Sequence, residues 1–445
     1  MTEKTSPGAP LNIAMGGRAL LTPLTGIGQY AAHLAREFVQ RGHNVRLFYG
    51  THWSSAIADG RAVKAAEAAE AAAAAQLAVV MPGNSPQAAG VKPGTLSAST
   101  CAGLGASQDA VEPGLERSLQ TSVMGLAKRF ARSYIPGVYR FMPHVEQFRF
   151  NLGVRREAPQ VYHDPNFIPM KFNGPTVLTA HDASWVRHPE YHPPHRLALL
   201  CANFPQALER ADRVIVVSEF VRRELLSCFS VAPEKLQVVY NGVSPRFRPY
   251  GADATRAVLS RHGLVHGSYF VAVGTLEPRK NLLTALAAHA RLPAAVRRAA
   301  PLVLIGVEGW LTDGLHAAFS ASLKDGTVRK LGYVTDAELP QLTAGARGMV
   351  YPSIYEGFGL PVLEAMACGV PVLCSTADAL REVVGDAGLL YDPADINGFA
   401  EGMQALLDDG ALRERLIAAG LARAGHFSWQ RTADETLDVY RQIVA

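Results

Sequence analysis

The stretch that decides the fold runs from Tyr351 to Pro371 and reads YPSIYEGFGLPVLEAMACGVP. We expect a buried strand to end at its first residue, a glycine-bearing loop to follow, and a helix to begin near Leu360. Pro361 is tolerated in the first turn of such a helix. The helix N-terminus exposes unpaired backbone N–H groups and the positive end of the helix dipole, and both favour a bound anion. This stretch therefore predicts an anion-binding loop between a strand and a helix.

Two carboxylates lie at different depths of this stretch. Glu356 stands in the loop and Glu364 lies one turn inside the expected helix. Gly357 and Gly359 let the backbone between them approach a ligand closely. Either glutamate alone would be an ordinary surface residue. Together they could hold hydroxyl groups at opposite ends of one nucleotide sugar.

A second cluster, Gly274 to Asn281, also follows an expected strand directly. It contains Arg279 and Lys280, two adjacent cations at the point where the chain turns into a helix. An arginine can hold a diphosphate through two hydrogen bonds, while a lysine acts as a point charge. Such a pair is often only solvated, but its place beside a strand end favours phosphate binding.

These segments resemble those of a known family. The spacing of Glu356 and Glu364 resembles the Glu, seven residues, Glu signature of retaining family-four glycosyltransferases of GT-B fold, and Gly274 to Asn281 resembles their phosphate-binding segment. Ile305-Gly306 and Leu331 to Val334 are also similar to the family. The resemblance covers nearly the whole chain except residues 54–114. It implies an α/β fold of two Rossmann-like domains that face each other across a cleft.

The resemblance also implies roles for individual residues. Glu356 would contact hydroxyls of the donor sugar, and Glu364 would contact the ribose. Arg279 and Lys280 would neutralise the leaving nucleoside diphosphate. Other donor contacts are implied for Gly274, Tyr333, Val334 and the backbone amides of Phe358, Gly359 and Leu360.

The first half of the chain carries weaker signals. Gly26-Ile27-Gly28 resembles the family's glycine loop before the first helix, which we expect at about 29–41, although a tight turn would look the same. His181-Asp182 closes an expected strand and resembles the acceptor-side histidine beside the donor's anomeric carbon, with a helix cap as the alternative. His163 and Asn166 resemble a stretch of mannosyltransferase-like members, with an Asp-Pro turn equally consistent.

The length of 445 residues exceeds one ordinary hydrophobic core and predicts two domains. We expect an N-terminal acceptor-side domain over 1–247 and a C-terminal nucleotide-sugar domain over 248–426. A C-terminal helix over 427–445 should pack back toward the first domain. Residues 54–114 are alanine-rich and then rich in Gly, Pro and Ser, which predicts a low-complexity insertion.

The composition of the chain indicates its cellular compartment and its partners. The formal net charge of +4 gives no reason to expect a nucleic-acid partner. Five scattered cysteines and an N-terminus without an apolar run favour a cytoplasmic protein. Basic and aromatic residues interleave from Leu115 to Arg156. We interpret them as helices covering the first domain, with peripheral contact to an anionic membrane as the alternative.

The sequence thus predicts a glycosyltransferase that breaks the bond between a hexose and a nucleoside diphosphate. Mannose from GDP-mannose, passed to a glycan or lipid-linked acceptor of surface polysaccharide, is the favoured reaction, with UDP- or TDP-linked glucose or rhamnose open. We expect no cofactor and no metal, because no Asp-x-Asp cluster is present. A silent nucleotide-sugar-binding subunit is one rival. A nicotinamide-dependent oxidoreductase is another, but it would want glycine where this chain has Ala31.

Overall fold

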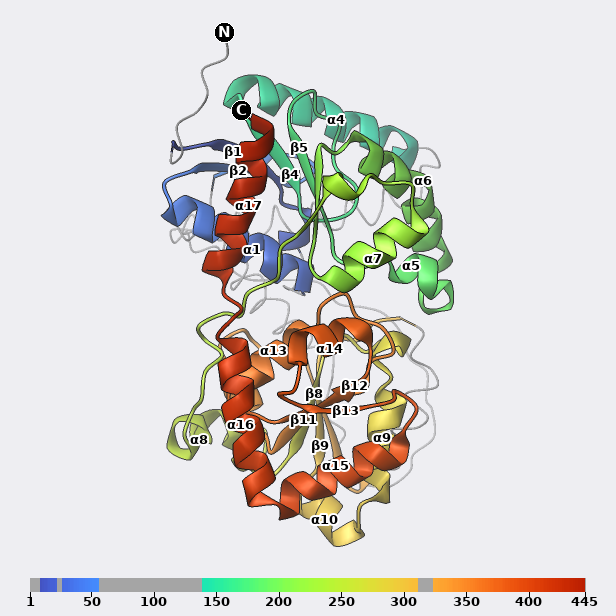
Figure 1. Ribbon diagram of the computed structural model, residues 1–445, viewed down its shortest axis with the longest axis vertical. Coiled ribbons are helices and arrows are strands. Elements are labelled where there is room, and N and C mark those ends of the chain that lie inside the picture. Colours follow the sequence, from blue (N-terminus) through green and yellow to red (C-terminus); the bar gives the residue numbers. More distant parts are fainter. Residues whose placement is uncertain (1–8, 22–25, 56–137, 311–322, 445) are drawn as a thin grey trace, which may run out of the picture. The chain divides into compact units, whose positions relative to one another are not determined.

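The computed structural model describes residues 9–21, 26–55, 138–310 and 323–444 (Figure 1). Almost all of the expected insertion at 54–114, and the basic stretch up to residue 137, lie outside these ranges. The chain divides into two compact units, residues 73–148 and the remainder. The second of these units contains both sheets described below.

The first sheet has seven strands in the described residues, in the order β3-β2-β1-β4-β5-β6-β7. All neighbours are parallel except β2 and β3. The strand order reverses direction between β1 and β4, so the connections leave this pair toward opposite edges of the sheet. The strands are β1 (Asn12–Gly16), β2 (Asn44–Phe48), β3 (Trp53–Ser54), β4 (Val161–Asp164), β5 (Thr176–Ala180), β6 (Arg213–Val216) and β7 (Leu236–Val238).

Helices cover both faces of this sheet because successive strand residues point to opposite sides. Ile13 and Met15 pack with α1 and α17, while Ala14, between them in β1, packs with Phe150 of α4. Residues of α6 and α7 share a further cluster with β5 and β6. These helices are α1 (Gly26–Gln40), α4 (Val138–Glu157), α6 (Pro194–Arg210), α7 (Glu219–Cys228) and α17 (Trp429–Val444), with a short α5 (Ser184–Arg187).

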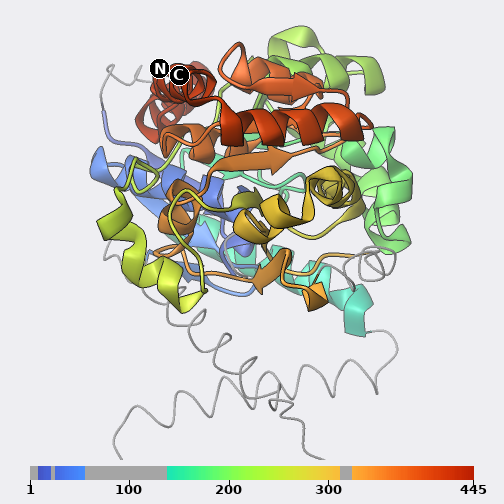
Figure 2. The same cartoon turned by 90° about the horizontal axis from the view of Figure 1, so that it is seen from below.

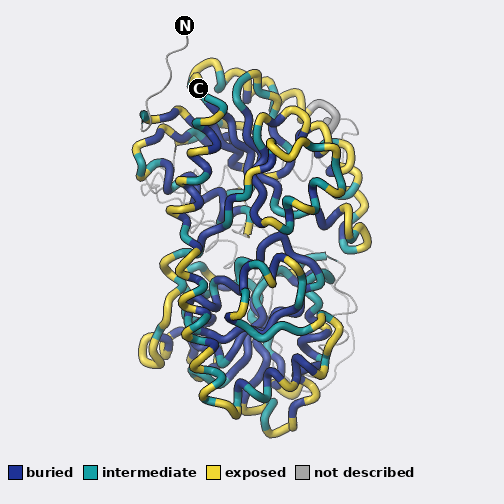
Figure 3. Tube along the Cα trace, viewed as in Figure 1, coloured by how far each residue is buried: buried dark blue, intermediate teal, exposed yellow. Residues whose placement is uncertain are grey.

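The second sheet has six parallel strands in the order β10-β9-β8-β11-β12-β13. Its four central strands, β8, β9, β11 and β12, are short and almost entirely buried (dark blue in Figure 3), whereas most residues of the edge strands β10 and β13 are half-buried. This pattern is typical of parallel sheets with helices on both sides. The strands are β8 (Phe270–Val273), β9 (Leu302–Ile305), β10 (Val328–Gly332), β11 (Gly348–Tyr351), β12 (Val372–Ser375) and β13 (Leu389–Tyr391).

The alternating direction of side chains along each strand again determines which helices pack on each face of the second sheet. Phe270 and Ala272 pack with residues of α9 and α15, whereas Val271 packs with residues of α13 and α14. Figure 1 labels these four helices around the strands, and Figure 2 shows the same ribbon turned by 90°. The helices of this half are α8 (Ala252–Arg261), α9 (Leu282–Arg291), α10 (Ala294–Ala299), α12 (Leu339–Ala344), α13 (Leu360–Ala367), α14 (Asp378–Val384), α15 (Ile396–Asp408) and α16 (Gly410–Ala424).

The fold class predicted from the sequence is confirmed, since both sheets are doubly wound, parallel apart from β3, and covered by helices on both faces. Two local expectations were wrong. The first helix includes Gly26 and Gly28 in its first turn, so these glycines do not form a loop before it. Strand β4 was not anticipated, because its four residues end in His163-Asp164 and look like a turn.

Candidate active site

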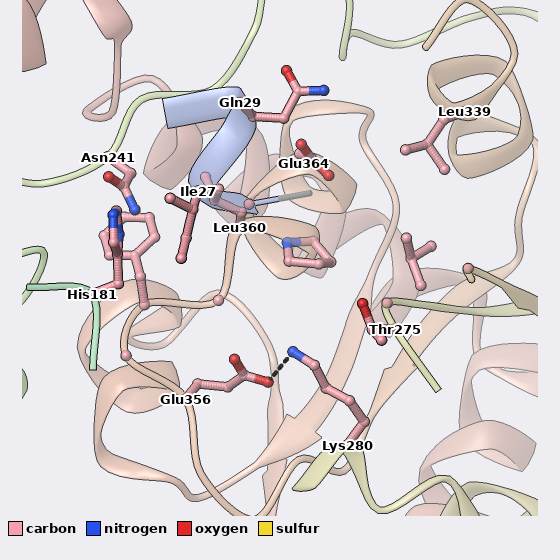
Figure 4. A pocket seen from close by; sticks show the side chains of 18 of the residues that line it. Ile27, Gln29, His181, Asn241, Thr275, Lys280, Leu339, Glu356, Leu360 and Glu364 are labelled. Atoms are coloured by element: carbon pink, nitrogen blue, oxygen red, sulfur yellow. Dashed lines mark hydrogen bonds and ion pairs between the residues drawn. The ribbon is translucent and has the colours of Figure 1, made fainter. Parts of the chain in front are cut away.

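A pocket of about 650 Å³ is lined by residues from both sheets. It lies beyond the carboxyl ends of the central strands, where parallel α/β sheets bind their ligands. Its walls include α1, the loop after β5, the turn after β8 and the loop before α13 (Figure 4). The two segments that the sequence singled out, 274–281 and 356–364, therefore share one cavity.

The loop before α13 is held against the first half of the chain by close backbone contacts. A Cβ atom on Gly357 would lie 1.8 Å from the carbonyl oxygen of His181, so only glycine fits there. The hydroxyl of Ser218 donates a hydrogen bond to the Gly357 carbonyl over 2.7 Å. Gly359 has φ +103°, which a glycine adopts without strain. These contacts fix the start of α13, where Gly359 and Leu360 line the pocket.

Four charged side chains form one buried cluster at the pocket wall. Lys280 donates to Glu356 over 2.7 Å, and Arg279 reaches Glu356 at 3.3 Å. Arg279 also donates to Glu277 over 2.7 Å. Burial opposes the charge of Glu356, but Lys280 and Arg279 outweigh it and lower the pKa of its carboxyl to about 2. Burial likewise disfavours the Arg279 cation, yet Glu356 and Glu277 raise its pKa further.

The cluster is therefore internally neutral, with two carboxylates balancing two cations. A diphosphate entering the pocket has to compete with Glu356 for Lys280 and Arg279. Glu277 holds the Arg279 guanidinium independently of Glu356.

A separate acidic pair lies further along the pocket. Burial, and then the charge of Asp336, raise the pKa of Glu364 to about 8. Gln29 of α1 donates to both carboxylate oxygens of Asp336 at 3.2 Å. Burial and the charge of Asp336 thus both favour the protonated form of Glu364, which can donate a hydrogen bond.

His181 is a neutral imidazole at the edge of the pocket. Burial lowers the pKa of this ring, against the effects of the Pro165 carbonyl and Asp182. Its Nε2 lies 2.8 Å from the Pro165 carbonyl, which can only accept, so Nε2 carries the proton and Nδ1 is an acceptor. Tyr30 packs edge-on against the ring at 5.0 Å. Asp182 caps the next turn by accepting from the backbone N–H and hydroxyl of Ser184.

Most predicted site residues do line this pocket: Gly26, His181, Asp182, Gly274, Arg279, Lys280, Tyr333, Val334, Glu356, Phe358, Gly359, Leu360 and Glu364. Gly28 is buried inside α1 and is not part of the lining. His163 is fully buried, is hydrogen-bonded to Thr179 and Tyr440, and does not line this pocket. Asn166 lines a second, neighbouring cavity instead.

Sequence reasoning missed several pocket residues. Gln29 and Asp336 are separated by 307 residues and meet only in the folded chain. Asn241, buried with its Oδ1 unpaired, also lines the pocket. Trp310 lies over the guanidinium of Arg196 at 5.3 Å. The position of Asp336 shortly after Gly332, where β10 ends, was a usable signal, whereas the other residues carried none.

The fold and pocket place the chain in the GT-B class of glycosyltransferases. A solved structure of WaaG, a glycosyltransferase involved in lipopolysaccharide biosynthesis, matches with a TM-score of 0.62 and 16% identity over 96% of this chain and 99% of that chain. Family models described as Glycosyltransferase Family 4 and Glycosyl transferases group 1 match residues 111–247 and 264–423. The chain belongs to the family-four glycosyltransferases and is an enzyme of the hexosyltransferase kind.

Two curated relatives are mannosyltransferases from Escherichia coli. The chain is 40% identical to O-antigen chain mannosyltransferase B over 284 residues, which cover 64% of this chain and 74% of that one. It is 30% identical to the serotype-specific mannosyltransferase WbdA over 241 residues, covering 53% of this chain. That match spans only 29% of WbdA, so the similarity concerns one part of a longer protein.

No helix in the described residues is long and apolar enough to cross a membrane. Within the same residues, no group of three His, Cys, Asp or Glu side chains is arranged to hold a metal ion.

Proposed function

We propose that the chain is a retaining mannosyltransferase that moves mannose from GDP-mannose to a glycan or lipid-linked acceptor of a surface polysaccharide. The observation that carries this proposal is the convergence of His181, Glu356, Lys280 and Arg279 on one pocket. The similarity to O-antigen chain mannosyltransferase B supports mannose as the sugar and O-antigen as the kind of product.

The pocket offers a place for each part of the donor. The nucleobase would lie near Tyr333 and Val334, and the ribose near Glu364. The diphosphate would face the α13 N-terminus, where Gly359 and Leu360 expose their amides, and would take Lys280 and Arg279 from Glu356. The mannose ring would then lie between Glu356 and the accepting Nδ1 of His181.

In the proposed reaction, the bond between the anomeric carbon and the diphosphate oxygen breaks. The acceptor hydroxyl forms the new bond on the same face, and the departing phosphate takes its proton. Charge accumulates on the leaving group, so preorganised cations and helix amides should supply the largest catalytic contribution. We include retention of the donor's anomeric configuration in the proposal because the family that the chain resembles is a retaining one.

The first test is a thermal-shift screen of GDP, UDP, TDP and NAD against the wild type and Glu364→Ala. Selective stabilisation by GDP that is lost in Glu364→Ala supports the donor assignment. Consumption of GDP-mannose and NMR of the product's anomeric proton then test transfer and retention. Selective binding of UDP or TDP would mean that the donor is a UDP- or TDP-linked sugar and not GDP-mannose. Binding of a nucleotide sugar without any turnover would favour a silent binding subunit.

We also propose that the protein works at the cytoplasmic face of a membrane, in peripheral contact with anionic lipid. Val145, Phe148 and Leu152 of α4 are exposed at a helical spacing, and Phe148 is 70% exposed. Arg149 and Arg155 are exposed on the same helix. Flotation with vesicles containing phosphatidylglycerol should recover the protein, and Phe148→Ser should reduce recovery. Equal recovery with neutral vesicles would contradict the proposed attraction between the exposed arginines of α4 and anionic lipid.

A further inference from the structure

Helix α7 of the first half of the chain lies against α14 of the second half (Figure 1). α7 begins shortly after β6 ends, and α14 begins shortly after β12 ends, so the contact forms at the carboxyl edges of both sheets. All residues of both helices are described by the structure, and none of them lines the active-site pocket. The contact can therefore influence the reaction only through other residues.

The first amides of α7 find their hydrogen-bond acceptor in the second half of the chain. A helix leaves its first four N–H groups without a partner inside the helix. Glu382 of α14 accepts from the N–H of Glu219 over 2.7 Å with one carboxylate oxygen, and from the N–H of Phe220 over 2.9 Å with the other. A carboxylate suits this place because a helix N-terminus carries partial positive charge. The position of α7 thus depends on Glu382.

The main chain at Glu382 is itself anchored within the second half. Arg423 of α16 donates to the Glu382 carbonyl over 2.6 Å and to the Val383 carbonyl over 2.9 Å. The same guanidinium lies over the ring of Phe427, at 5.1 Å from its centroid. The segment that carries the Glu382 carboxylate is therefore held by groups other than α7.

Ser218 connects the start of α7 to the active-site loop. Its hydroxyl oxygen accepts from the N–H of Val221 over 3.1 Å, which caps the helix, and its hydroxyl donates to the Gly357 carbonyl over 2.7 Å. Ser218 is fully buried, so water cannot replace these partners without a local opening. Gly357 lies between Glu356 and Phe358, and all three line the pocket. A displacement of the α7 N-terminus would therefore reach the loop that carries Glu356.

We infer that Glu382 is a positioning residue for the glycosyltransferase reaction. Its carboxylate holds the N-terminus of α7, and α7 in turn holds the loop of Glu356 through Ser218. Glu382 does not line the pocket and acts through these two elements. The inference goes beyond the proposed function, on which only its turnover measurement rests.

The test compares variants along this path with a helix cap elsewhere. Glu382→Ala removes both hydrogen bonds to α7, whereas Glu382→Gln keeps one accepting oxygen and is the milder change. Ser218→Ala removes the link between α7 and the loop and leaves Glu382 in place. Asp409→Ala is the matched control, because Asp409 caps α16 by accepting from the N–H of Leu412 over 2.9 Å within the second half.

Hydrogen exchange followed by mass spectrometry measures the loop directly and needs no substrate. In Glu382→Ala we expect faster exchange at the start of α7 and also in the segment 355–360. Glu382→Gln should show a smaller increase at both places. Asp409→Ala should speed exchange at the start of α16 and leave the segment 355–360 unchanged.

Turnover of GDP-mannose shows whether Glu382 and Ser218 act along one path. Each alanine variant should lower kcat/KM about 10-fold, as expected for the loss of hydrogen bonds to a charged or buried group. The loss should lie mainly in kcat, because neither residue lines the donor pocket. The double variant should also lose about 10-fold, since residues of one network are not additive. Asp409→Ala should match the wild type.

Unchanged exchange of the segment 355–360 in both Glu382 variants would overturn the inference and leave Glu382 as a cap of α7 alone. A loss of about 100-fold in the double variant would also overturn it, because the two residues would then act independently. Failure of the proposed function would look different. In that case the wild type consumes no GDP-mannose, while the exchange comparison still decides the role of Glu382.

Discussion

The carboxyl edges of the two sheets bring different chemistry to the active-site region. The second sheet presents Glu277, Arg279, Lys280 and Glu356 as one buried cluster of ion pairs. The first sheet presents a neutral His181 and separate carboxylates, each tied to a backbone N–H. Charged groups that are already oriented suit a leaving diphosphate, whose charge grows during the reaction. Hydrogen-bond acceptors without net positive charge suit the hydroxyls of sugars.

The largest expected effect comes from breaking the ion-paired cluster. Lys280→Met leaves Glu356 with Arg279, at 3.3 Å, as its remaining cation in the cluster, so we expect transfer to fall by about 10²–10³-fold. Removing one partner of a buried ion pair should also lower the free energy of unfolding by about 3–5 kcal/mol. Urea unfolding and turnover measure both. The double variant with Glu356→Gln should recover stability without recovering activity, and recovery of both would contradict the assigned roles.

The next effect concerns the contact that joins the two edges. Gly357→Ala places a methyl group against the His181 carbonyl and should push the loop and the histidine apart. A displacement of about 1 Å can cost about 10²-fold in rate. Turnover and circular dichroism distinguish this from unfolding. Gly251→Ala is the control, since its Cβ would meet nothing within 4 Å. Full activity in Gly357→Ala would show that the close contact is dispensable.

A smaller effect is expected from Glu364, whose pKa lies above its ordinary value. Between about pH 4.5 and pH 8, the unfolded chain releases this proton and the folded chain keeps it. Stability therefore falls as pH rises through this window. Glu364→Gln removes this contribution, so its Tm should fall less than that of the wild type between about pH 5 and pH 8. Burial also raises the pKa of Asp164 to about 6, but Asp164 is present in both proteins, so its titration does not change the difference between their Tm values. Parallel curves would mean that Glu364 titrates normally.

The smallest effect should follow removal of the contact between Gln29 and Asp336. Gln29→Ala loses hydrogen bonds at 3.2 Å in a partly buried place. We expect a loss of about 0.5–1.5 kcal/mol in unfolding free energy and a modest rise in donor KM. Gln404→Ala removes a comparable bond on the exposed face of α15 and is the control. A large loss of turnover in Gln29→Ala would place this contact within the catalytic machinery.

Sequence prediction succeeded best in the second half, and the reason is physical. Lys280 follows β8 and Glu356 follows β11, so each lies on a short segment directly after a strand, and parallel strands bring such segments together. The motifs could therefore be interpreted without coordinates. In the first half, His163 and Asp164 are adjacent in sequence, yet strand alternation turns one toward the core and the other toward a cavity. The different environments of His163 and Asp164 could have been predicted only if β4 had been recognised as a strand.

The last helix has a consequence for how the protein is made. Trp429, Leu437 and Tyr440 of α17 belong to the same apolar cluster as Ile13 and Leu34, and the Tyr440 hydroxyl bonds to His163. Domains commonly fold as units while the ribosome is still adding residues. Strand β1 therefore lacks part of its apolar packing until α17 has been synthesised. The apolar cluster on this face of the first sheet should thus be completed only after α17 has left the exit tunnel.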